Sequence, residues 1–310
     1  MTYLILISSF VALIYGADML VRGAVNLASA FGVPTLIIGL TIVAWGTSAP
    51  ELVVSLTAGL SGEYGIALGN IIGSNIANIL LIGGVAAILL PIVTTASGLK
   101  FNSVLLVLVS GVLALMVLYG YLNPWVGCAL IAAKLLILYR SFRAAEVPEV
   151  AKADGINPPR AAAFTVAGMV LVGAGGYFLV DAAEKLALLW RVPPAIIGLT
   201  VVAIGTSVPE LAATIAAARQ KQGDLILGNI IGSNLANILI VFGFTALFVP
   251  GHVPYPGAYA PVLGLMMIST IALLSFVLLK RRLCWRTGSI FLGTYVIFLL
   301  APYLLNGPYS

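Results

Sequence analysis

The chain alternates long apolar stretches with short polar interruptions that contain Pro, Gly or charged residues. A transmembrane helix needs roughly 20 consecutive, mostly apolar residues, and this pattern of apolar stretches predicts such helices along the whole chain. We expect ten, near residues 3–28, 34–60, 66–90, 101–120, 124–141, 161–188, 194–218, 224–249, 258–279 and 288–305. The fold class predicted is therefore an all-α integral membrane protein with ten transmembrane helices.

Composition supports a membrane protein. Of the 310 residues 61% are hydrophobic and only 8% are charged, whereas soluble proteins carry about 25% charged residues. This excludes a cytosolic enzyme, a nucleic-acid binder and a secreted disulfide scaffold. No Ser-His, Cys-His or paired-Asp constellation is present, so we expect neither an enzyme nor a cofactor. We interpret Cys128 and Cys284 as packing residues, and the first apolar run, which lacks a basic flank, as a span and not a cleaved signal.

The sequence repeats itself at an offset of 159 residues. Residues 37–52 (IIGLTIVAWGTSAPEL) align with residues 196–211 (IIGLTVVAIGTSVPEL), identical at 13 of 16 positions. At the same offset, residues 68–80 (LGNIIGSNIANIL) align with residues 227–239 (LGNIIGSNLANIL), identical at 12 of 13 positions. Because one offset serves both blocks, a whole unit has been duplicated. Residues 1–141 form the first five-helix repeat, residues 142–160 a linker, and residues 161–310 the second repeat.

An odd number of spans per repeat forces the second copy to enter the membrane from the opposite side. Inverted repeats of this kind are typical of secondary transporters, in which broken helices meet at a site near the midplane of the bilayer. Basic residues agree with this topology, because one set of alternate loops carries eleven of them and the other set only two, Lys185 and Arg191. The positive-inside rule places the linker in the cytoplasm and both termini outside. We expect Lys134 to snorkel to the cytoplasmic side and Asp18 to pair with Arg22.

Two acidic residues, Glu51 and Glu210, lie deep in apolar spans at equivalent repeat positions, and neither has a cation nearby in the sequence. A carboxylate in the bilayer is costly, and it is a functional-site candidate by default. On a helix, the preceding Thr and Ser of each motif share a face with the Glu. These hydroxyls belong to Thr47 and Ser48 in the first repeat, and to Thr206 and Ser207 in the second.

A proline precedes each glutamate. Pro50 and Pro209 remove a helical N–H and clash with the carbonyl four residues earlier, so we expect free backbone carbonyls around Ala44–Gly46 and Ala203–Gly205. A kink that serves only packing is the alternative interpretation for a single proline. The same Thr-Ser-x-Pro-Glu motif twice after a glycine favours a site.

The second block of each repeat places an Asn-Ser-Asn stripe on one helix face. The stripe consists of Asn70, Ser74 and Asn78, and of Asn229, Ser233 and Asn237 in the copy. We interpret the serines and the last asparagine of each stripe as site residues. Asn70 and Asn229 are equally consistent with a structural role, in which the amide bonds a neighbouring backbone. Gly65, Gly69 and Gly73 are typical of close helix packing.

Every candidate ligand is an oxygen atom. Hard cations such as Ca²⁺ take six to eight oxygens, whereas Zn, Cu or Fe favours Cys or His. The single histidine, His252, lies in a predicted loop, where we expect a surface role. One Ca²⁺, two Na⁺ or two protons would neutralise the two carboxylates equally, and this equivalence is the physical basis of antiport.

The paired GTS-x-PE and GN-x-x-GS-x-x-x-N blocks resemble the α-repeats of the cation/calcium exchanger superfamily, and the ten-span layout is similar to that of its prokaryotic sodium/calcium exchangers. The resemblance implies alternating access by sliding of residues 3–28 and 161–188. It also implies a central Ca²⁺ site flanked by Na⁺ sites, formed by Glu51, Glu210, Thr47, Thr206, Ser48, Ser207, Ser74, Ser233, Asn78 and Asn237, with the carbonyls of Ala44 and Ala203. Well-studied sodium/calcium members carry one Asp where this chain has Asn78 and Asn237.

The sequence therefore predicts an antiporter that extrudes Ca²⁺ in exchange for Na⁺ across the plasma (inner) membrane. A Ca²⁺/H⁺ exchanger is the alternative in the same class, and a cation channel with a ring of carboxylates is the alternative in another class. The expected partners are Ca²⁺ and Na⁺, or H⁺, as substrates, together with the lipid bilayer. We expect no nucleic-acid partner, and we expect the chain to act as a monomer.

Overall fold

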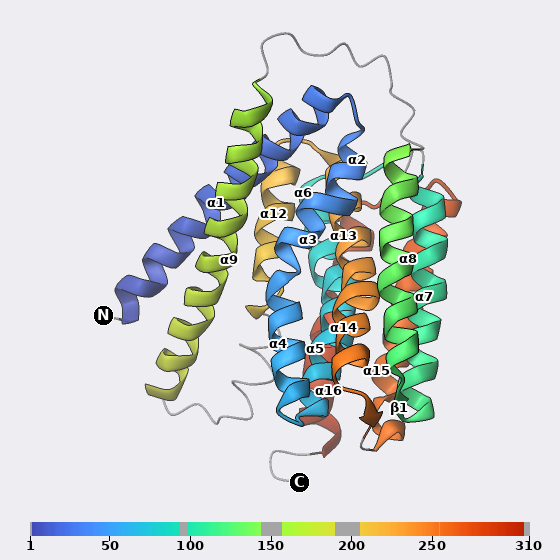
Figure 1. The fold of residues 1–310 in the computed structure, drawn as a ribbon. Helices are drawn as coiled ribbons and strands as arrows, with labels where there is room; N and C mark the ends of the chain where they lie inside the picture. The colour runs from blue at the N-terminus through green and yellow to red at the C-terminus, as the bar shows by residue number, and fades with distance from the viewer. Residues whose placement is uncertain (1, 94–97, 144–156, 190–204, 254, 307–310) are drawn as a thin grey trace.

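The computed structural model describes residues 2–93, 98–143, 157–189, 205–253 and 255–306. These residues are almost entirely helical (Figure 1). The first half contains α1 (Thr2–Phe31), α2 (Thr35–Ile38), π-helix η1 (Gly39–Val43), α3 (Ala44–Thr47), α4 (Ala49–Leu60), α5 (Tyr64–Ala77), π-helix η2 (Asn78–Ile82), α6 (Gly83–Leu89), α7 (Leu99–Tyr119), β1 (Tyr121–Leu122) and α8 (Pro124–Arg143). The second half contains α9 (Pro158–Leu189), α12 (Val208–Arg219), α13 (Gly223–Ala236), π-helix η4 (Asn237–Phe242), α14 (Gly243–Phe248), β2 (Gly251–His252), the 3₁₀-helix η5 (Pro256–Tyr259), α15 (Ala260–Leu278) and α16 (Trp285–Asn306).

Helices long and apolar enough to cross a membrane make up most of the described chain. Six qualify, or seven when the bent pair Thr35–Thr47 and Ala49–Leu60 counts as one span. The predicted stretches outside residues 190–204 coincide with described helices, although α8, α12 and α16 are not among the six that qualify. The chain is an all-helical, multi-span membrane protein, as the sequence predicts. The first part of the stretch predicted at 194–218 lies outside the described residues.

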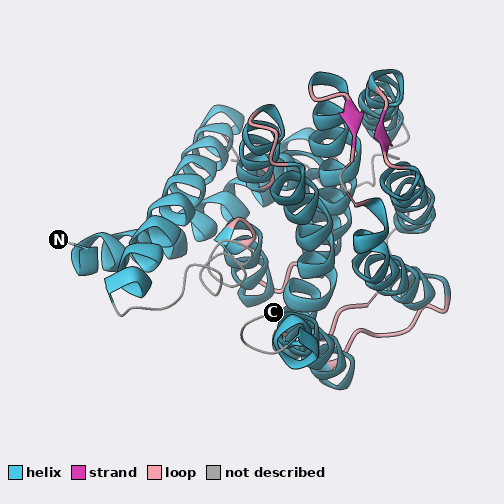
Figure 2. Cartoon of the chain, turned by 90° about the horizontal axis from the view of Figure 1, so that it is seen from below, coloured by secondary structure: helices cyan, strands magenta, loops and turns pink. Residues whose placement is uncertain are grey.

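The two long helices α1 and α9 form a pair beside the main bundle (Figures 1 and 2). They pack along each other more extensively than any other two described elements. Glycines bring the backbones together: a Cβ atom at Gly16 would lie 2.7 Å from the Leu171 Cβ, and one at Gly23 would lie 2.5 Å from the Thr165 backbone nitrogen. Small residues permit this close approach of helices in a membrane. The pair can therefore behave as one rigid element against the bundle.

The centre of the bundle is built from the second block of each repeat. The spans Tyr64–Leu89 and Gly223–Phe248 are the most buried of the apolar spans among the described residues. Each is interrupted by a π-helix that begins at an equivalent asparagine, Asn78 in η2 and Asn237 in η4. A π-turn within an α-helix leaves part of the regular hydrogen-bond ladder unmade and is frequent at functional sites. The core therefore contains local irregularity at the two positions that the sequence predicts to be functional.

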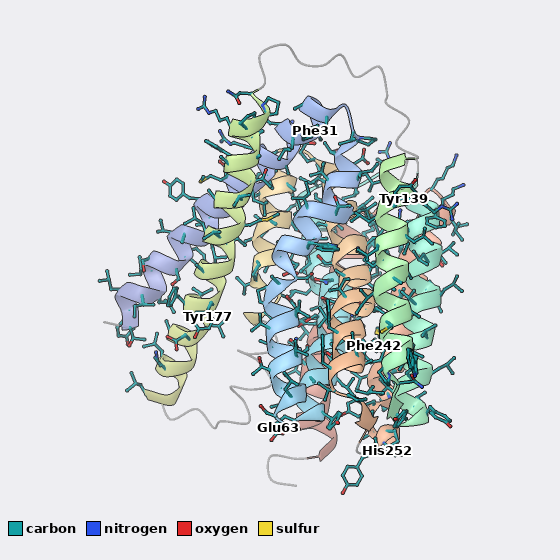
Figure 3. All side chains as sticks on the ribbon, in the orientation of Figure 1. Phe31, Glu63, Tyr139, Tyr177, Phe242 and His252 are labelled. Carbon is teal, nitrogen blue, oxygen red and sulfur yellow. The ribbon has the colours of Figure 1, made fainter. Side chains whose placement is uncertain are left out.

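Several peripheral predictions can be compared with the structure. Asp18 and Arg22 form an ion pair of 2.8 Å, and both cysteines are free. His252 is exposed on β2, where its ring packs edge-on against Tyr121 with the ring centroids 5.2 Å apart; Figure 3 shows it at the lower end of the molecule. The expectation for Lys134 is wrong. This residue is only 3% exposed and shares the face of α8 that packs on α14 and η4, because the helix turns it away from solvent and lipid.

Candidate cation site

Each Thr-Ser-x-Pro-Glu motif breaks its helix in the same way. Ser48 has φ −85° and ψ 7°, and Ser207 has φ −90° and ψ 2°, so the two serines adopt the same conformation in the two repeats. Pro50 and Pro209 then occupy the first turn of α4 and α12, where the missing N–H costs nothing. In the first repeat the two helical segments meet at an angle of 45°. Each proline thus lies in the first turn of the helix that follows the break, and does not only interrupt the helix that precedes it.

The break places both glutamates at helix N-termini. Glu51 and Glu210 lie in the first turns of α4 and α12, where the helix dipole favours negative charge. Both side chains are buried, with exposed fractions of 0% and 1%. The short helix α3 ends just before Ser48, so its carbonyl end points toward the same region and favours a cation. The broken helix therefore provides a negative site that the backbone itself helps to stabilise.

The two repeats meet at these carboxylates. The Ser48 hydroxyl of the first repeat donates a hydrogen bond of 3.1 Å to the Glu210 carboxylate of the second. Glu51 and Glu210 are close enough for their charges to interact. The structure thus brings together the residues from two motifs that are 159 positions apart in the sequence.

The first asparagine of each stripe ties its helix to the neighbouring broken helix. The Asn70 amide nitrogen donates to the Glu51 carbonyl at 3.2 Å and to the Ser55 hydroxyl at 2.8 Å. In the second repeat, the Asn229 amide donates to the Thr214 hydroxyl at 3.3 Å. Ser55 and Thr214 stand at equivalent repeat positions, outside the two motif blocks. They are partners that the sequence interpretation missed, and their equal offset was the available signal.

Asn70 also makes a contact across the repeats. The Thr206 hydroxyl of the second repeat donates to the Asn70 side-chain oxygen at 3.2 Å. In the copy, the Ser233 hydroxyl approaches the Asn229 side-chain oxygen at 3.5 Å. Asn70 is therefore engaged by three hydrogen-bonding groups. Of the two roles considered for Asn70 and Asn229, the structural one agrees with these contacts, because the amides position the helices that carry the glutamates.

The remaining polar atoms of the predicted site are buried and have no hydrogen-bond partner within the described part of the chain. A buried polar group without a partner costs about 1–3 kcal/mol, and a charged group costs more. Such atoms cluster in this site: both carboxylate oxygens of Glu51, one of Glu210, the hydroxyls of Ser74 and Ser207, and the side-chain oxygens of Asn78 and Asn237. Oxygens of this kind are suitable ligands for a hard cation, whereas the side-chain nitrogens of Asn78 and Asn237, which also have no partner, are not.

Helix packing explains how the last asparagines reach the centre. The π-helix η2, which begins at Asn78, packs against α12, and η4, which begins at Asn237, packs against α4. Each asparagine thus lies beside the helix that carries the glutamate of the opposite repeat. Asn75 and Asn234 directly follow the two serines and lie off the stripes. Their amide nitrogens donate to the carbonyls of Ile71 and Ile230, while their side-chain oxygens have no partner among the described residues.

The predicted backbone ligands are only partly described. The Ala44 carbonyl already accepts the Ser48 backbone N–H at 3.1 Å, and the Thr47 hydroxyl donates to the Val43 carbonyl at 3.0 Å. The Thr47 hydroxyl also lies 3.4 Å from the Ala44 carbonyl oxygen, so both lone pairs of this oxygen already face a donor. Ala203 lies outside the described residues. Of the twelve predicted ligands, the structure describes all but this one.

The chemistry of the donor set is that of a hard cation. No group of three or more His, Cys, Asp or Glu side chains occurs among the described residues, so two carboxylates are joined by neutral oxygens only. Ca²⁺ accepts carboxylate, carbonyl and hydroxyl-type oxygens in flexible geometry. The oxygens listed above therefore fit a cation that binds six or more such ligands, and they fit poorly a metal that requires nitrogen or sulfur.

The fold and the site define an ion transporter of the broken-helix type. The chain belongs to the sodium/calcium exchanger family: residues 1–143 and 160–304 match the family described as "sodium/calcium exchanger protein". This family membership agrees with the resemblance seen in the sequence, and it shows that the protein is a transporter and not an enzyme.

Related proteins match this chain over nearly their whole length. The chain is 35% identical to the inner membrane protein YrbG of Escherichia coli (strain K12), covering 97% of each. It is 31% identical to the sodium/calcium exchanger MaX1 of Methanosarcina acetivorans, covering 98% of this chain and 99% of that protein. Among solved structures, the sodium-calcium exchanger NCX_Mj, soaked with 10 mM Na⁺ and 10 mM Sr²⁺, superposes with a TM-score of 0.85 at 30% identity over 96% of both chains.

Proposed function

We propose that the protein is a secondary active antiporter that exchanges Ca²⁺ for Na⁺ by alternating access and extrudes Ca²⁺ from the cytoplasm. The observation that carries this proposal is the meeting of Glu51 and Glu210 at two broken helices, with unpartnered oxygens of both repeats around them. A site with two negative charges binds one Ca²⁺ or two Na⁺ with equal neutralisation. Because the same oxygens serve either set of ions, the ions compete, and exchange follows.

The proposal includes ten spans in two inverted repeats of five. Three further helices, α8, α12 and α16, complete the proposed count, and the part of the predicted span 194–218 that precedes residue 205 lies outside the described residues. In Figure 1 the end of α8 and the start of α9 lie at the same end of the molecule, the upper one. The positive-inside rule assigns this end to the cytoplasm, since most basic loop residues belong to it. Residues 142–160 are then the cytoplasmic linker, and both termini lie outside.

The two long helices α1 and α9 each face one broken helix, and the gap between the two elements differs in the two repeats. This difference supports alternating access. At the cytoplasmic end, α1 packs against α12, and the Gln220 amide donates to the Asp18 carboxylate at 3.0 Å. The equivalent of Asp18 in the second repeat is Tyr177, which is 68% exposed and lines a cavity of about 270 Å³ between α9 and α4. An arrangement closed at the cytoplasmic end and open at the other corresponds to an outward-facing state. Sliding of the α1–α9 pair would exchange the two gaps.

Transport by purified protein in proteoliposomes tests the proposal. Uptake of ⁴⁵Ca²⁺ should require an outward Na⁺ gradient and should be competed by unlabelled Ca²⁺ more strongly than by Mg²⁺ or Mn²⁺. Liposomes with Na⁺ on both sides are the control. Calcium flux that needs no counter-ion gradient and varies only with the membrane potential would identify a channel. That result would overturn the proposal.

Ca²⁺/H⁺ exchange is the second candidate function. It is favoured by one observation: both positions at the start of the π-helices are asparagines, so the described site contains only two carboxylates. Two protons neutralise this pair as two Na⁺ would. Calcium uptake driven by a pH gradient in Na⁺-free liposomes, at the rate obtained with Na⁺, would replace Na⁺ by H⁺ as the counter-ion while leaving the site residues unchanged.

A further inference from the structure

A cavity connects the outer part of α9 with the candidate cation site. Its volume is about 270 Å³, and it lies between α9, α4 and the start of α12. Its inner wall contains Pro50, Thr206 and Pro209. Each proline directly precedes a site glutamate, and Thr206 is itself a predicted ligand. The cavity therefore reaches the two broken helices where they carry the site residues, although Glu51 and Glu210 themselves do not line it.

The wall formed by α9 contains one charged residue. Among the described residues that line the cavity, Asp181 alone carries a charge, and the others are Pro, Val, Gly, Tyr and Thr. α9 lies close to the broken helix at this level, since a Cβ atom at Gly176 would stand 3.1 Å from the Pro209 side chain. Asp181 lies one turn after Tyr177, which also lines the cavity, so the two side chains share a face of α9.

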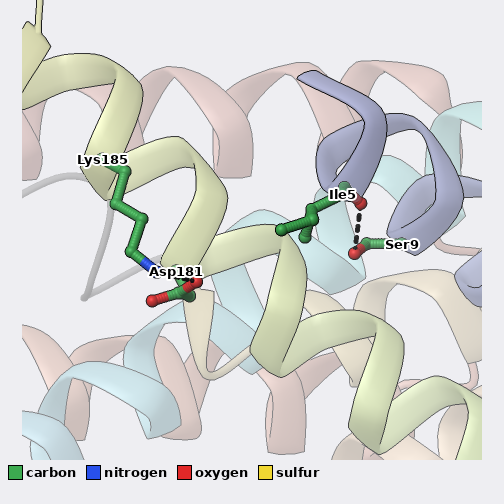
Figure 4. Close-up of polar contacts among 4 residues, drawn as sticks. All are labelled: Ile5, Ser9, Asp181 and Lys185. Atoms are coloured by element: carbon green, nitrogen blue, oxygen red, sulfur yellow. Dashed lines mark hydrogen bonds and ion pairs between the residues drawn. The ribbon is translucent and has the colours of Figure 1, made fainter. Parts of the chain in front are cut away.

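Asp181 is held by a basic neighbour. The Lys185 ammonium lies 2.7 Å from the Asp181 carboxylate, one turn along α9 (Figure 4). The Asp181 side chain is 34% exposed and that of Lys185 is 57% exposed, so the protein encloses neither. An exposed pair at this spacing contributes only about 0.3–0.5 kcal/mol to helix stability. The carboxylate is therefore free to exchange its partner for a passing cation at little cost.

The carboxylate of Asp181 has no counterpart at the equivalent position of the first repeat. At the offset of 159, the equivalent of Asp181 is Arg22 on α1, a residue of opposite charge. Arg22 pairs with Asp18 at the cytoplasmic end. The outer gap thus presents a negative charge at the position where the inner gap presents a positive one, and Asp181 lines the cavity described above.

We propose that Asp181 is the entry residue for cations on the outer side, and that Lys185 tunes it. This inference rests on the proposed function. A carboxylate on an otherwise uncharged, apolar wall concentrates cations at the mouth of the cavity, because the low-dielectric surroundings focus its field. The Lys185 ammonium opposes this effect and shields Asp181 while no cation is present. Asp181 thereby governs the encounter with external Ca²⁺, and Glu51 and Glu210 govern binding.

Sided transport measurements test the assignment. In right-side-out membrane vesicles loaded with Na⁺, the initial rate of ⁴⁵Ca²⁺ uptake is measured against external Ca²⁺ for the wild type, Asp181→Asn, Asp181→Glu and Lys185→Gln. We expect Asp181→Asn to raise the KM for external Ca²⁺ about threefold with Vmax unchanged, and Lys185→Gln to lower it by a similar factor, as loss of a steering charge changes the association rate. Asp181→Glu should keep the wild-type KM.

Glu63→Gln is the matched control. Glu63 is an exposed carboxylate at the same, lower end of the molecule (Figure 3), but it does not line the cavity. Its removal should leave KM unchanged. The difference between wild type and Asp181→Asn should shrink when choline chloride raises the ionic strength, because screening shortens the reach of the charge.

These measurements distinguish a failure of the role proposed for Asp181 from a failure of the proposed antiport function. Wild-type uptake combined with an unchanged KM in Asp181→Asn would overturn the role of Asp181 alone. An equal rise of KM in Glu63→Gln would do the same, because the effect would then be one of general surface potential. Absence of Ca²⁺ uptake in the wild type would overturn the proposed function and, with it, the entry role.

Discussion

The Ser48 hydroxyl donates a hydrogen bond of 3.1 Å to the Glu210 carboxylate, although the two residues lie 162 positions apart. This bond joins the broken helix of one repeat to the glutamate of the other. The symmetric bond is missing within the described chain: the Ser207 hydroxyl and both carboxylate oxygens of Glu51 have no partner. The repeats are thus equivalent in sequence but not in hydrogen bonding, and the two carboxylates are not interchangeable in this conformation.

Neutralising either glutamate should abolish transport. Glu51→Gln and Glu210→Gln keep the shape of the side chain and remove one of two charges that a divalent cation needs, so we expect Na⁺-driven ⁴⁵Ca²⁺ uptake to fall to the background of empty liposomes. Folding should survive, since an amide is cheaper to bury than a carboxylate. Thermal unfolding in detergent checks this. Normal flux in either variant would remove that glutamate from the site.

The asymmetry between the two serines leads to a second prediction. A hydrogen bond to a charged group contributes about 1.5–3 kcal/mol, so loss of the Ser48 bond should raise the KM for Ca²⁺ roughly tenfold or more in Ser48→Ala. Ser207→Ala is the matched variant and should have the smaller effect when Ca²⁺ is offered from the outside. Equal effects in the two variants would indicate that the Ser48–Glu210 bond plays no part in binding.

Particular residues show how far the sequence alone could lead. The spacing of Thr47, Ser48 and Glu51, repeated 159 positions later, was enough to predict one polar face per repeat, because helical geometry is local. The spacing could not predict the hydrogen bonds that Ser48 and Asn70 make across the repeats, since these bonds depend on how helices distant in the sequence pack. The prediction for Lys134 was wrong for the same reason. Its distance along α8 allowed snorkelling, but the packing of α8 on η4 buries it.

Adding a carboxylate at the start of η4 should change the counter-ion dependence. In Asn237→Asp, a third negative charge would lie beside the buried pair, and we expect Ca²⁺ uptake to require more Na⁺, seen as a steeper dependence of the rate on internal Na⁺. Asn123→Asp is the control. Its side-chain oxygen accepts the Trp125 N–H at the start of α8, a role that Asp also fills. An unaltered Na⁺ response in Asn237→Asp would make Asn237 a structural amide.

The contact between Gln220 and Asp18 should bias the protein toward its outward-facing form. It is a bond between the end of α12 and α1, at the end of the molecule that we propose to be cytoplasmic, and its loss in Gln220→Ala should favour the opposite state. We expect the KM for Ca²⁺ to fall on the cytoplasmic side and to rise on the outer side by about fivefold, for a bond of about 1 kcal/mol. Inside-out and right-side-out vesicles give the two values. Arg22→Gln is the control, because it removes the other partner of Asp18, within α1, and should leave both KM values unchanged. A shift of KM on only one side in Gln220→Ala would contradict the two-state interpretation.

The close seam between α1 and α9 should tolerate no added atoms. In Gly23→Ala, the new Cβ would lie 2.5 Å from the Thr165 nitrogen and 2.6 Å from its hydroxyl, a clash that must push the helices apart, and overpacking of this kind costs about 1–3 kcal/mol. We expect a lower unfolding temperature and slower exchange, because the pair no longer moves as one element. Gly111→Ala on α7 is the control: its Cβ meets no described atom within 4 Å, and alanine is the better helix former by about 1 kcal/mol. If Gly23→Ala matched Gly111→Ala in both stability and transport rate, the glycine seam would have no mechanical role, and α1 and α9 would have to move independently.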